Sequence, residues 1–178
     1  MPLLVDREVA YRLAIPRDSG DIYAFGSDSA LPSFHIPGRI ERMIAEGFVM
    51  LAHLDDLLVG CAGMLPNHVN AYHTPDGEIK LFELPNRYFG TMLVDPSHRG
   101  LGIGKHLYGL RLERVLESFD GPIYVELLGD GTPDSVDASA LVGLRFYLSH
   151  GFAHLGYSVD EDAGKVLLLP PRAGRAPA

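Results

Sequence analysis

The sequence predicts a mixed α/β fold, in which a sheet carries helices on both of its faces. Segments with strand character and segments with helical periodicity follow the order β-α-α-β-β-β-α-β-α-β-β, which is typical of this class. The chain has 178 residues, 47% of them apolar and 21% charged, so it can bury a sizeable core. We therefore expect one domain over residues 1–170, followed by a disordered tail over residues 171–178, which is rich in proline and alanine.

The part of the chain before residue 66 predicts three strands and two helices. Apolar and polar residues alternate up to Pro16, as in a strand with one buried face. Asp18 and Ser19 can cap the helix that follows. Farther on, Ile40, Met43 and Ile44 recur with helical spacing. The expected strands are Tyr11–Ile15, Phe48–His53 and Leu57–Leu65, joined by an acidic turn at Asp55 and Asp56, and the expected helices are Arg17–Gly26 and Gly38–Glu46.

The part after residue 65 predicts an insertion and then strands and helices again. Residues 66–85 are polar and rich in turn formers, with short strand character at Ile79–Leu84, so we expect an extended hairpin or insertion. On the next helix, Arg111 is expected among the charged residues beside a wide apolar face. The expected elements are a strand Tyr88–Val94, a helix Lys105–Phe119, a strand Pro122–Leu128, a loop Gly129–Asp137 that ends in a helix cap, a helix Ala138–His150 with Gly151 as its left-handed C-cap, and a hairpin of Phe152–Val159 and Lys165–Leu169.

The segment Arg87–Gly104 predicts a phosphate-binding turn. A β-rich run ends at Asp95 and Pro96, and a glycine-rich stretch then leads into a helix. Glycines at alternate positions let successive backbone N–H groups turn toward one point, which lies at the positive end of the helix dipole. Such a point is a natural seat for phosphate. A turn that serves only tight packing between strand and helix is the alternative interpretation.

The spacing of these glycines excludes two common phosphate loops. A dinucleotide-binding fingerprint would require glycine at Lys105, or glycine or a small residue at Leu107. A P-loop that ends at Gly104 and Lys105 would require glycine in place of Arg99 and serine or threonine in place of His106. A dinucleotide- or ATP-binding domain is therefore disfavoured.

The segment instead resembles the acyl-CoA loop of the GNAT superfamily of N-acetyltransferases, Q/R-x-x-G-x-G/A, with Arg99, Gly102 and Gly104 at the defining positions. A second stretch, Leu144–Phe152, resembles the FYxxxGF helix end of the same family. The resemblance extends over Tyr11–Leu169. It implies a GNAT-like fold, with a twisted, mostly antiparallel sheet and helices on both faces.

The same resemblance implies acetyl-CoA as the acyl donor and gives roles to particular residues. Backbone N–H groups around Met92, Leu93 and Val94 would align the pantetheine arm and polarise the carbonyl. Tyr147 matches the general acid that protonates the CoA thiolate, and a tyrosine packed in the core is the alternative. The pyrophosphate would be held by the loop residues Arg99, Gly100, Leu101, Gly102, Ile103, Gly104 and Lys105.

The sequence offers two candidates for the general base. Many relatives carry a glutamate on the strand before the loop, where this chain has Tyr88, Phe89 and Gly90. Glu83 and Glu126 are the candidates in its place, acting directly or through a water molecule. A chain without an effective base would be a non-catalytic acyl-CoA-binding module, which is the alternative to a transferase.

Charge and composition limit the partners. The net charge of −8 argues against nucleic acid, since binding to the phosphate backbone favours a basic face. No apolar run is long enough for a bilayer, and the N-terminus does not resemble a secretory signal, so we expect a cytoplasmic protein with no membrane partner. The single cysteine, Cys61, lies in an apolar segment and predicts a buried strand thiol. The eight histidines show no zinc spacing, so no metal is expected.

Taken together, these patterns predict an N-acetyltransferase that moves an acetyl group from acetyl-CoA to a primary amine. Transfer is expected to be direct, because Cys61 looks structural and no other covalent nucleophile is evident. The acceptor is an amine-bearing small molecule or a protein amine, and the sequence does not choose between them. The resemblance also implies a homodimer, because family members often associate through their C-terminal strands.

Overall fold

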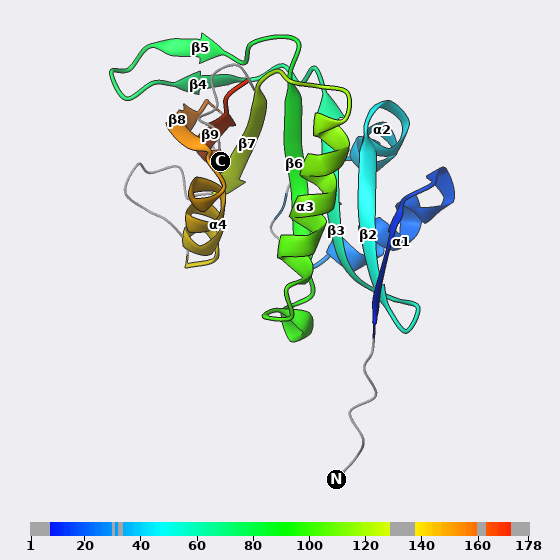
Figure 1. The fold of residues 1–178 in the computed structure, drawn as a ribbon. Coiled ribbons are helices and arrows are strands. Elements are labelled where there is room, and N and C mark those ends of the chain that lie inside the picture. The colour runs from blue at the N-terminus through cyan, green and yellow to red at the C-terminus, as the bar shows by residue number, and fades with distance from the viewer. Residues whose placement is uncertain (1–7, 30, 32–33, 129–137, 160–162, 172–178) are drawn as a thin grey trace. The chain divides into compact units, whose positions relative to one another are not determined.

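The computed structural model describes residues 8–29, 31, 34–128, 138–159 and 163–171, and the chain divides into two compact units (Figure 1). The first unit comprises Met1–Leu65 and Gly90–Ser118, and the second comprises Pro66–Phe89 and Phe119–Ala178. Strand β6 (Arg87–Val94) starts in the second unit and ends in the first. The single domain expected over residues 1–170 stays a prediction.

The strands of the first unit are β1 (Val9–Leu13), β2 (Phe48–Leu54) and β3 (Leu57–Pro66), followed in the sheet by β6. β1 pairs with β2, and β2 with β3, in the antiparallel direction. Asp55 and Asp56 form the β2–β3 turn with φ angles of 49° and 65°, and positive φ at both central residues matches the twist of hairpin strands. The predicted acidic turn is confirmed.

Helices cover both faces of these strands. They are α1 (Ser19–Gly26), α2 (Arg39–Glu46) and α3 (Ile103–Leu116). A Cβ added to Gly60 of β3 would meet Leu107 of α3 at 3.0 Å. Successive strand residues point to opposite faces, and the next residue, Cys61, packs with Ile22 of α1 and Met43 of α2. The predicted placement of helices on both faces is therefore confirmed within this unit.

The prediction that Arg111 lies among the charged residues on the outer face of α3 is wrong. Its side chain is fully buried, and Nη1 donates to the backbone oxygens of Gly63 and Thr91 at 3.2 and 3.1 Å. Arg111 falls on the same helical stripe as the buried Ile103 and Leu107. The residue type alone predicts an exposed position for Arg111. In the structure its guanidinium is buried, because backbone carbonyls of β3 and β6 accept its hydrogen bonds.

The described residues of the second unit form five further strands. They are β4 (Ala71–His73), β5 (Ile79–Leu81), β7 (Ile123–Leu128), β8 (Ala153–Ser158) and β9 (Ala163–Leu169). Their order, starting from β6, is β6-β7-β9-β8-β4-β5. β6 and β7 are parallel, pairing at Arg87 and Tyr88, whereas the other pairs of this unit are antiparallel. The sheet is mixed and mostly antiparallel, as predicted.

The polar insertion before β6 forms the hairpin that its turn residues predict. β4 and β5 are short, and strand structure covers Ile79–Leu81 but does not continue to Leu84. β4 also pairs with β8, where Tyr72 lies opposite Ser158. The insertion therefore extends the sheet of the second unit beyond β8.

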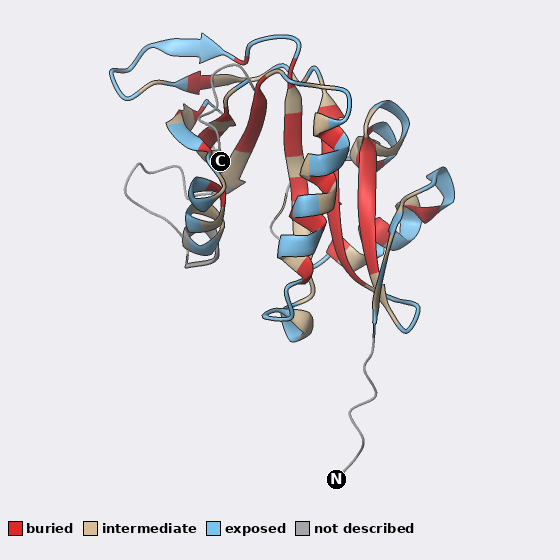
Figure 2. Ribbon diagram, in the orientation of Figure 1, coloured by how far each residue is buried: buried red, intermediate tan, exposed pale blue. Residues whose placement is uncertain are grey.

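Aromatic residues form much of the core of the second unit. Phe82 stacks on Tyr124 with ring centroids 4.1 Å apart and an interplanar angle of 4°. Helix α4 (Ala138–Ser149) ends as predicted, because Gly151 has a φ of 86° and the N–H of Phe152 donates to the carbonyl of Tyr147. Figure 2 shows the buried positions concentrated on the strands within each unit, with β5 exposed.

Several element boundaries differ from their expected positions, and some expectations lie outside the described residues. The first strand ends at Leu13 rather than Ile15, since Pro16 opens a 3₁₀ turn. The loop Gly129–Asp137 with its cap, the turn at Asp160–Asp162 and residues 172–178 of the tail are outside the described residues. Within the described part of the chain, no helix is both long enough and apolar enough to cross a membrane.

Candidate functional site

The candidate cofactor loop joins β6 to α3 in the first unit. The Asp95 carboxylate accepts a hydrogen bond from the backbone N–H of Ser97 at 2.7 Å, and Nδ1 of His98 lies 3.2 Å from it. The hydroxyl of Ser97 also bonds to this carboxylate and holds the pKa of Asp95 below its usual value. These contacts turn the chain from the strand end into the single 3₁₀ turn Pro96–His98.

Two glycines of the loop adopt left-handed backbone conformations. Gly100 has a φ of 82° and Gly102 a φ of 80°, a region that other residues rarely occupy. A Cβ added to either glycine would meet no heavy atom within 4 Å. Tight packing therefore does not explain these glycines. They give the turn its conformation and leave the backbone open to an approaching group.

The start of α3 lacks a side-chain cap. Gly102 is the N-cap residue, and the first intrahelical hydrogen bond runs from the N–H of His106 to its carbonyl oxygen at 3.0 Å. The N–H groups of Ile103, Gly104 and Lys105 precede that bond, so the helix itself supplies them with no acceptor. The first turn of α3 contains no acidic residue. A helix start of this kind can bind an anion such as a phosphate.

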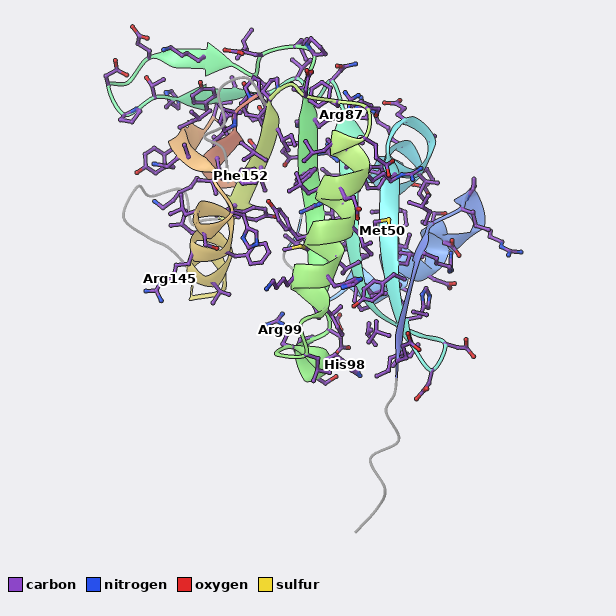
Figure 3. All side chains as sticks on the ribbon, viewed as in Figure 1. Met50, Arg87, His98, Arg99, Arg145 and Phe152 are labelled. Carbon is purple, nitrogen blue, oxygen red and sulfur yellow. The ribbon has the colours of Figure 1, made fainter. Side chains whose placement is uncertain are left out.

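Cationic side chains flank this helix start. Arg99 is exposed, and its Nε donates to the carbonyl oxygen of Val94 at 3.3 Å. Lys105 is exposed in the first turn of α3. Figure 3 shows Arg99 and His98 at the loop that precedes the helix. The predicted pyrophosphate residues thus lie on one continuous turn with positive charge on it.

The strand end before the loop is held in place by the first unit. Met92, Leu93 and Val94 are half-buried on β6, directly before the loop. The N–H of Asp95 donates to the carbonyl of Val59 on β3 at 2.9 Å. Together with the buried Arg111 on the Thr91 carbonyl, this bond fixes the backbone of the residues predicted to align the pantetheine arm.

The predicted general acid, Tyr147, lies in the second unit near the end of α4. Its side chain is 3% exposed, and its ring makes edge contacts with Phe146 and Phe152 at centroid distances of 5.5 and 5.1 Å. Its backbone carbonyl accepts from the N–H groups of His150 and Phe152. The ring is therefore firmly oriented by its neighbours, which suits either a packed tyrosine or a positioned acid.

Glu126, one of the two predicted bases, is the centre of a polar cluster in the second unit. Its Oε1 accepts hydrogen bonds from Nδ2 of Asn70 at 2.6 Å and from Oγ of Ser158 at 2.9 Å. Its Oε2 accepts one from the hydroxyl of Tyr88 at 2.8 Å. The ring of His68 stacks on Tyr88 with centroids 4.2 Å apart. A half-buried carboxylate among neutral donors can accept a proton through one of them.

Glu83, the other predicted base, has different surroundings. It is exposed, and its backbone N–H donates to the hydroxyl of Tyr124 at 3.1 Å. Its backbone carbonyl accepts from Nδ2 of the buried Asn86. These contacts position its backbone, whereas its carboxylate lies toward solvent. Of the two candidates, Glu126 has the more defined environment.

The sequence interpretation missed the side chains that surround Glu126. Asn70, Tyr88 and Ser158 lie 56, 38 and 32 residues from Glu126 along the chain. No local pattern links them, because they meet only when β6, β8 and the residue before β4 take their places in the sheet. The one available signal is the alternation on β6 and β7, where Tyr88 pairs with Tyr124 and Glu126 follows on the same face.

Cysteine and metal chemistry are not evident in the described residues. Cys61 is fully buried on β3, as predicted, and burial raises the pKa of its thiol to about 12. Among the residues with a described position, no group of three histidine, cysteine, aspartate or glutamate side chains could hold a metal ion.

Comparison with protein families gives one match. Residues 45–154 match the model of an acetyltransferase (GNAT) domain, a range that includes the loop, Glu126 and Tyr147. No curated protein matches the sequence.

Solved structures share the fold at low sequence identity. A GNAT-family structure from Desulfovibrio desulfuricans aligns with a TM-score of 0.65 at 17% identity, covering 92% of this chain and 99% of its own. Arabidopsis thaliana Naa50, in complex with a bisubstrate analogue of CoA and a peptide, gives 0.62 at 16%, covering 90% and 97%. The Escherichia coli N-acetyltransferase of the ribosomal protein S18 alanine gives 0.62 at 13%, covering 92% and 94%.

Proposed function

Because this chain belongs to the GNAT acetyltransferase family, we propose that it is an N-acetyltransferase that moves an acetyl group from acetyl-CoA directly to a primary amine. One observation carries the proposal. The start of α3 is an uncapped helix end behind two left-handed glycines with open space beside them, flanked by Arg99 and Lys105. This arrangement fits a pyrophosphate and explains the glycines, which packing does not.

Separate segments of the chain fit the pyrophosphate and the pantetheine arm of acetyl-CoA. Acetyl-CoA supplies an activated thioester, so the protein has to position an amine and handle two protons. The pyrophosphate would rest on the N–H groups from Gly100 to Lys105, with Arg99 beside it. The backbone of Met92, Leu93 and Val94 would hold the pantetheine arm and polarise the thioester carbonyl.

We assign the proton steps to the second unit. Glu126 would accept the proton that the attacking amine loses, through the Tyr88 hydroxyl or a water molecule, because its own oxygens already accept three hydrogen bonds. Tyr147 would donate its phenolic proton to the sulfur as the C–S bond breaks. Glu83 is the less favoured base because it is exposed.

The acceptor is proposed as a primary amine of a small molecule or of a protein. Two of the similar structures support a protein amine, since one holds a CoA–peptide analogue and the other belongs to an enzyme named for a ribosomal protein alanine. The net charge of −8 is compatible with a cationic acceptor. The cytoplasmic location stays a prediction.

The test is release of free CoA thiol from acetyl-CoA by the purified protein, with acetyl-CoA binding measured by calorimetry. The panel should include polyamines, aminoglycosides, lysine and peptides with free N-termini. Release with one class of amine, together with acetyl-CoA binding, is the expected outcome. The buried Cys61 adds no background to a thiol assay of the folded protein.

A non-catalytic acyl-CoA-binding module is the second candidate. It is favoured by β6, which runs from Arg87 to Val94 without the glutamate that many family members use. Binding of acetyl-CoA without thiol release from any amine of the panel would favour this module over a transferase. No binding at all would contradict both functions.

A further inference from the structure

The hairpin β4–β5 lies beyond β8 and forms one edge of the sheet in the second unit. β9 lies between β7 and β8, and β8 lies between β9 and β4. β9 is therefore an interior strand, and β4 covers the end of β8 at Tyr157 and Ser158. On this side of the sheet the edge strand is β5, Ile79–Leu81.

The backbone of β5 offers hydrogen-bonding groups on its outer side. The N–H of Thr74 donates to the carbonyl of Glu78 at 2.8 Å, and the N–H of Phe82 donates to the carbonyl of Asn70 at 2.9 Å. Glu78 and Phe82 thus direct their backbone groups toward β4. Because alternate residues of an antiparallel strand face opposite neighbours, the N–H and C=O groups of Ile79 point away from the sheet.

The side chains of β5 are exposed and divide by type between its two faces. Ile79 and Leu81 lie on one face and are 64% and 67% exposed. Glu78 and Lys80 lie on the other face, where Nζ and Oε2 are 3.5 Å apart. Figure 2 shows β5 exposed along its length. Exposed edges with apolar side chains are usually avoided in monomers, since they pair with other strands.

We propose that β5 pairs with β5 of a second copy of this chain, in the antiparallel direction, with Ile79 on the two-fold axis. In this register Ile79 exchanges both backbone hydrogen bonds with the partner's Ile79. Glu78 then lies opposite the partner's Lys80, and Lys80 opposite the partner's Glu78. The four side chains of Ile79 and Leu81 from the two copies form one apolar row on the other face.

The charge pattern favours a second copy over an unrelated strand. Opposite charges two residues apart, centred on Ile79, are self-complementary under a two-fold axis. A shift of the register by two residues would place Lys80 opposite the partner's Lys80, and like charges directly opposite each other destabilise a sheet. The pairing joins two short strands, so we expect a modest affinity and a concentration-dependent dimer.

Cysteine crosslinking tests the register. The native Cys61 is buried, so an introduced cysteine is the only accessible thiol in the described residues. Facing residues of a non-hydrogen-bonded pair have Cα atoms about 4.5 Å apart, which a disulfide can span. When the Glu78→Cys protein is mixed with a tagged Lys80→Cys protein, mild oxidation should give the disulfide between the two proteins. The second facing pair of this dimer, native Lys80 and native Glu78, remains intact. Leu57→Cys, equally exposed in the first unit, is the control for random collision and should give little crosslink.

The oligomeric state tests the dimer itself. Analytical ultracentrifugation of the wild-type chain should show a mass that rises toward that of a dimer as the concentration approaches about 100 μM. Ile79→Lys should remain monomeric, and the double reversal Glu78→Lys with Lys80→Glu should keep the dimer that Lys80→Glu alone weakens. Circular dichroism checks that each variant is folded. A wild-type chain that stays monomeric at this concentration, or a Lys80→Cys protein that crosslinks with itself as well as the mixture does, would overturn the proposal.

Discussion

The loop between β6 and α3 and the cluster around Glu126 contrast two ways of building a site. The loop consists of consecutive residues and offers backbone N–H groups, which need only glycines at Gly100 and Gly102 and an uncapped helix start. The cluster consists of side chains from separate strands, brought to one carboxylate by the sheet. The first kind of site can be recognised in a sequence, whereas the second appears only in the fold.

Replacement of Tyr147 by phenylalanine should have the largest effect on turnover. Loss of the proton donor should lower kcat by on the order of 10³-fold, because positioned acids contribute 10²–10⁴-fold. Acetyl-CoA affinity should not change, since the ring still packs between Phe146 and Phe152. Steady-state kinetics and calorimetry on the same preparation check this pair of results. Equal turnover by Tyr147→Phe and wild type would make Tyr147 a packed aromatic residue.

Glu126→Gln should have the next largest effect, with kcat lowered by on the order of 10²-fold. The amide keeps the size of the side chain but cannot accept the proton of the amine. Glu83→Gln is the matched control, because it removes a carboxylate from the same unit at an exposed position. We expect kcat of the Glu83 variant to stay within about twofold of wild type. The reverse ranking of the two variants would move the base to Glu83.

Gly102→Ala should weaken acetyl-CoA binding by about tenfold, since a Cβ disfavours the left-handed conformation by about 1 kcal/mol and intrudes on the open backbone. Gly38→Ala is a close match in backbone strain. Gly38 is also a helix N-cap with open space around it, at φ 77° and ψ −4°, against 80° and 0° for Gly102. Calorimetry should show near-normal acetyl-CoA affinity for the Gly38 variant. Equal losses in both variants would mean that strain, rather than contact with the cofactor, explains the effect.

Asp18→Asn should produce the smallest effect, and on stability alone. The Arg12 guanidinium, bonded to Asp18 at 2.7 and 2.9 Å, holds the pKa of this carboxyl at about 2 against the ordinary 3.8. Because Arg12 is half exposed, we expect the variant to lose about 1 kcal/mol of unfolding free energy at pH 7.

The pH dependence of that loss follows from the lowered pKa of Asp18. The stabilisation is complete above the unfolded value of 3.8 and disappears as the pH falls through about 2. Urea unfolding curves of both proteins should therefore converge toward pH 2. If the variant lost activity as well as stability, Asp18 would not have a purely structural role.

The sequence by itself determined the loop and most of the elements around it. The run from β6 through the glycines to α3 is local, so its left-handed turn depends on Gly100 and Gly102. The spacing of Arg99, Gly102 and Gly104 is the basis of its resemblance to the GNAT family. The buried Cys61, the Asp55–Asp56 turn and the Gly151 C-cap were predictable for the same reason, since each depends on immediate neighbours.

Only the tertiary structure decided the positions that depend on contacts between distant segments. Arg111 is buried because carbonyls of β3 and β6 accept its hydrogen bonds, which no property of α3 alone reveals. Glu126 gained its environment from residues 32 to 56 positions away, and β5 became an edge strand because the insertion covers β8. Local patterns report backbone conformation, whereas the partners of a side chain are set by strand order and register, which follow from the packing of the whole sheet.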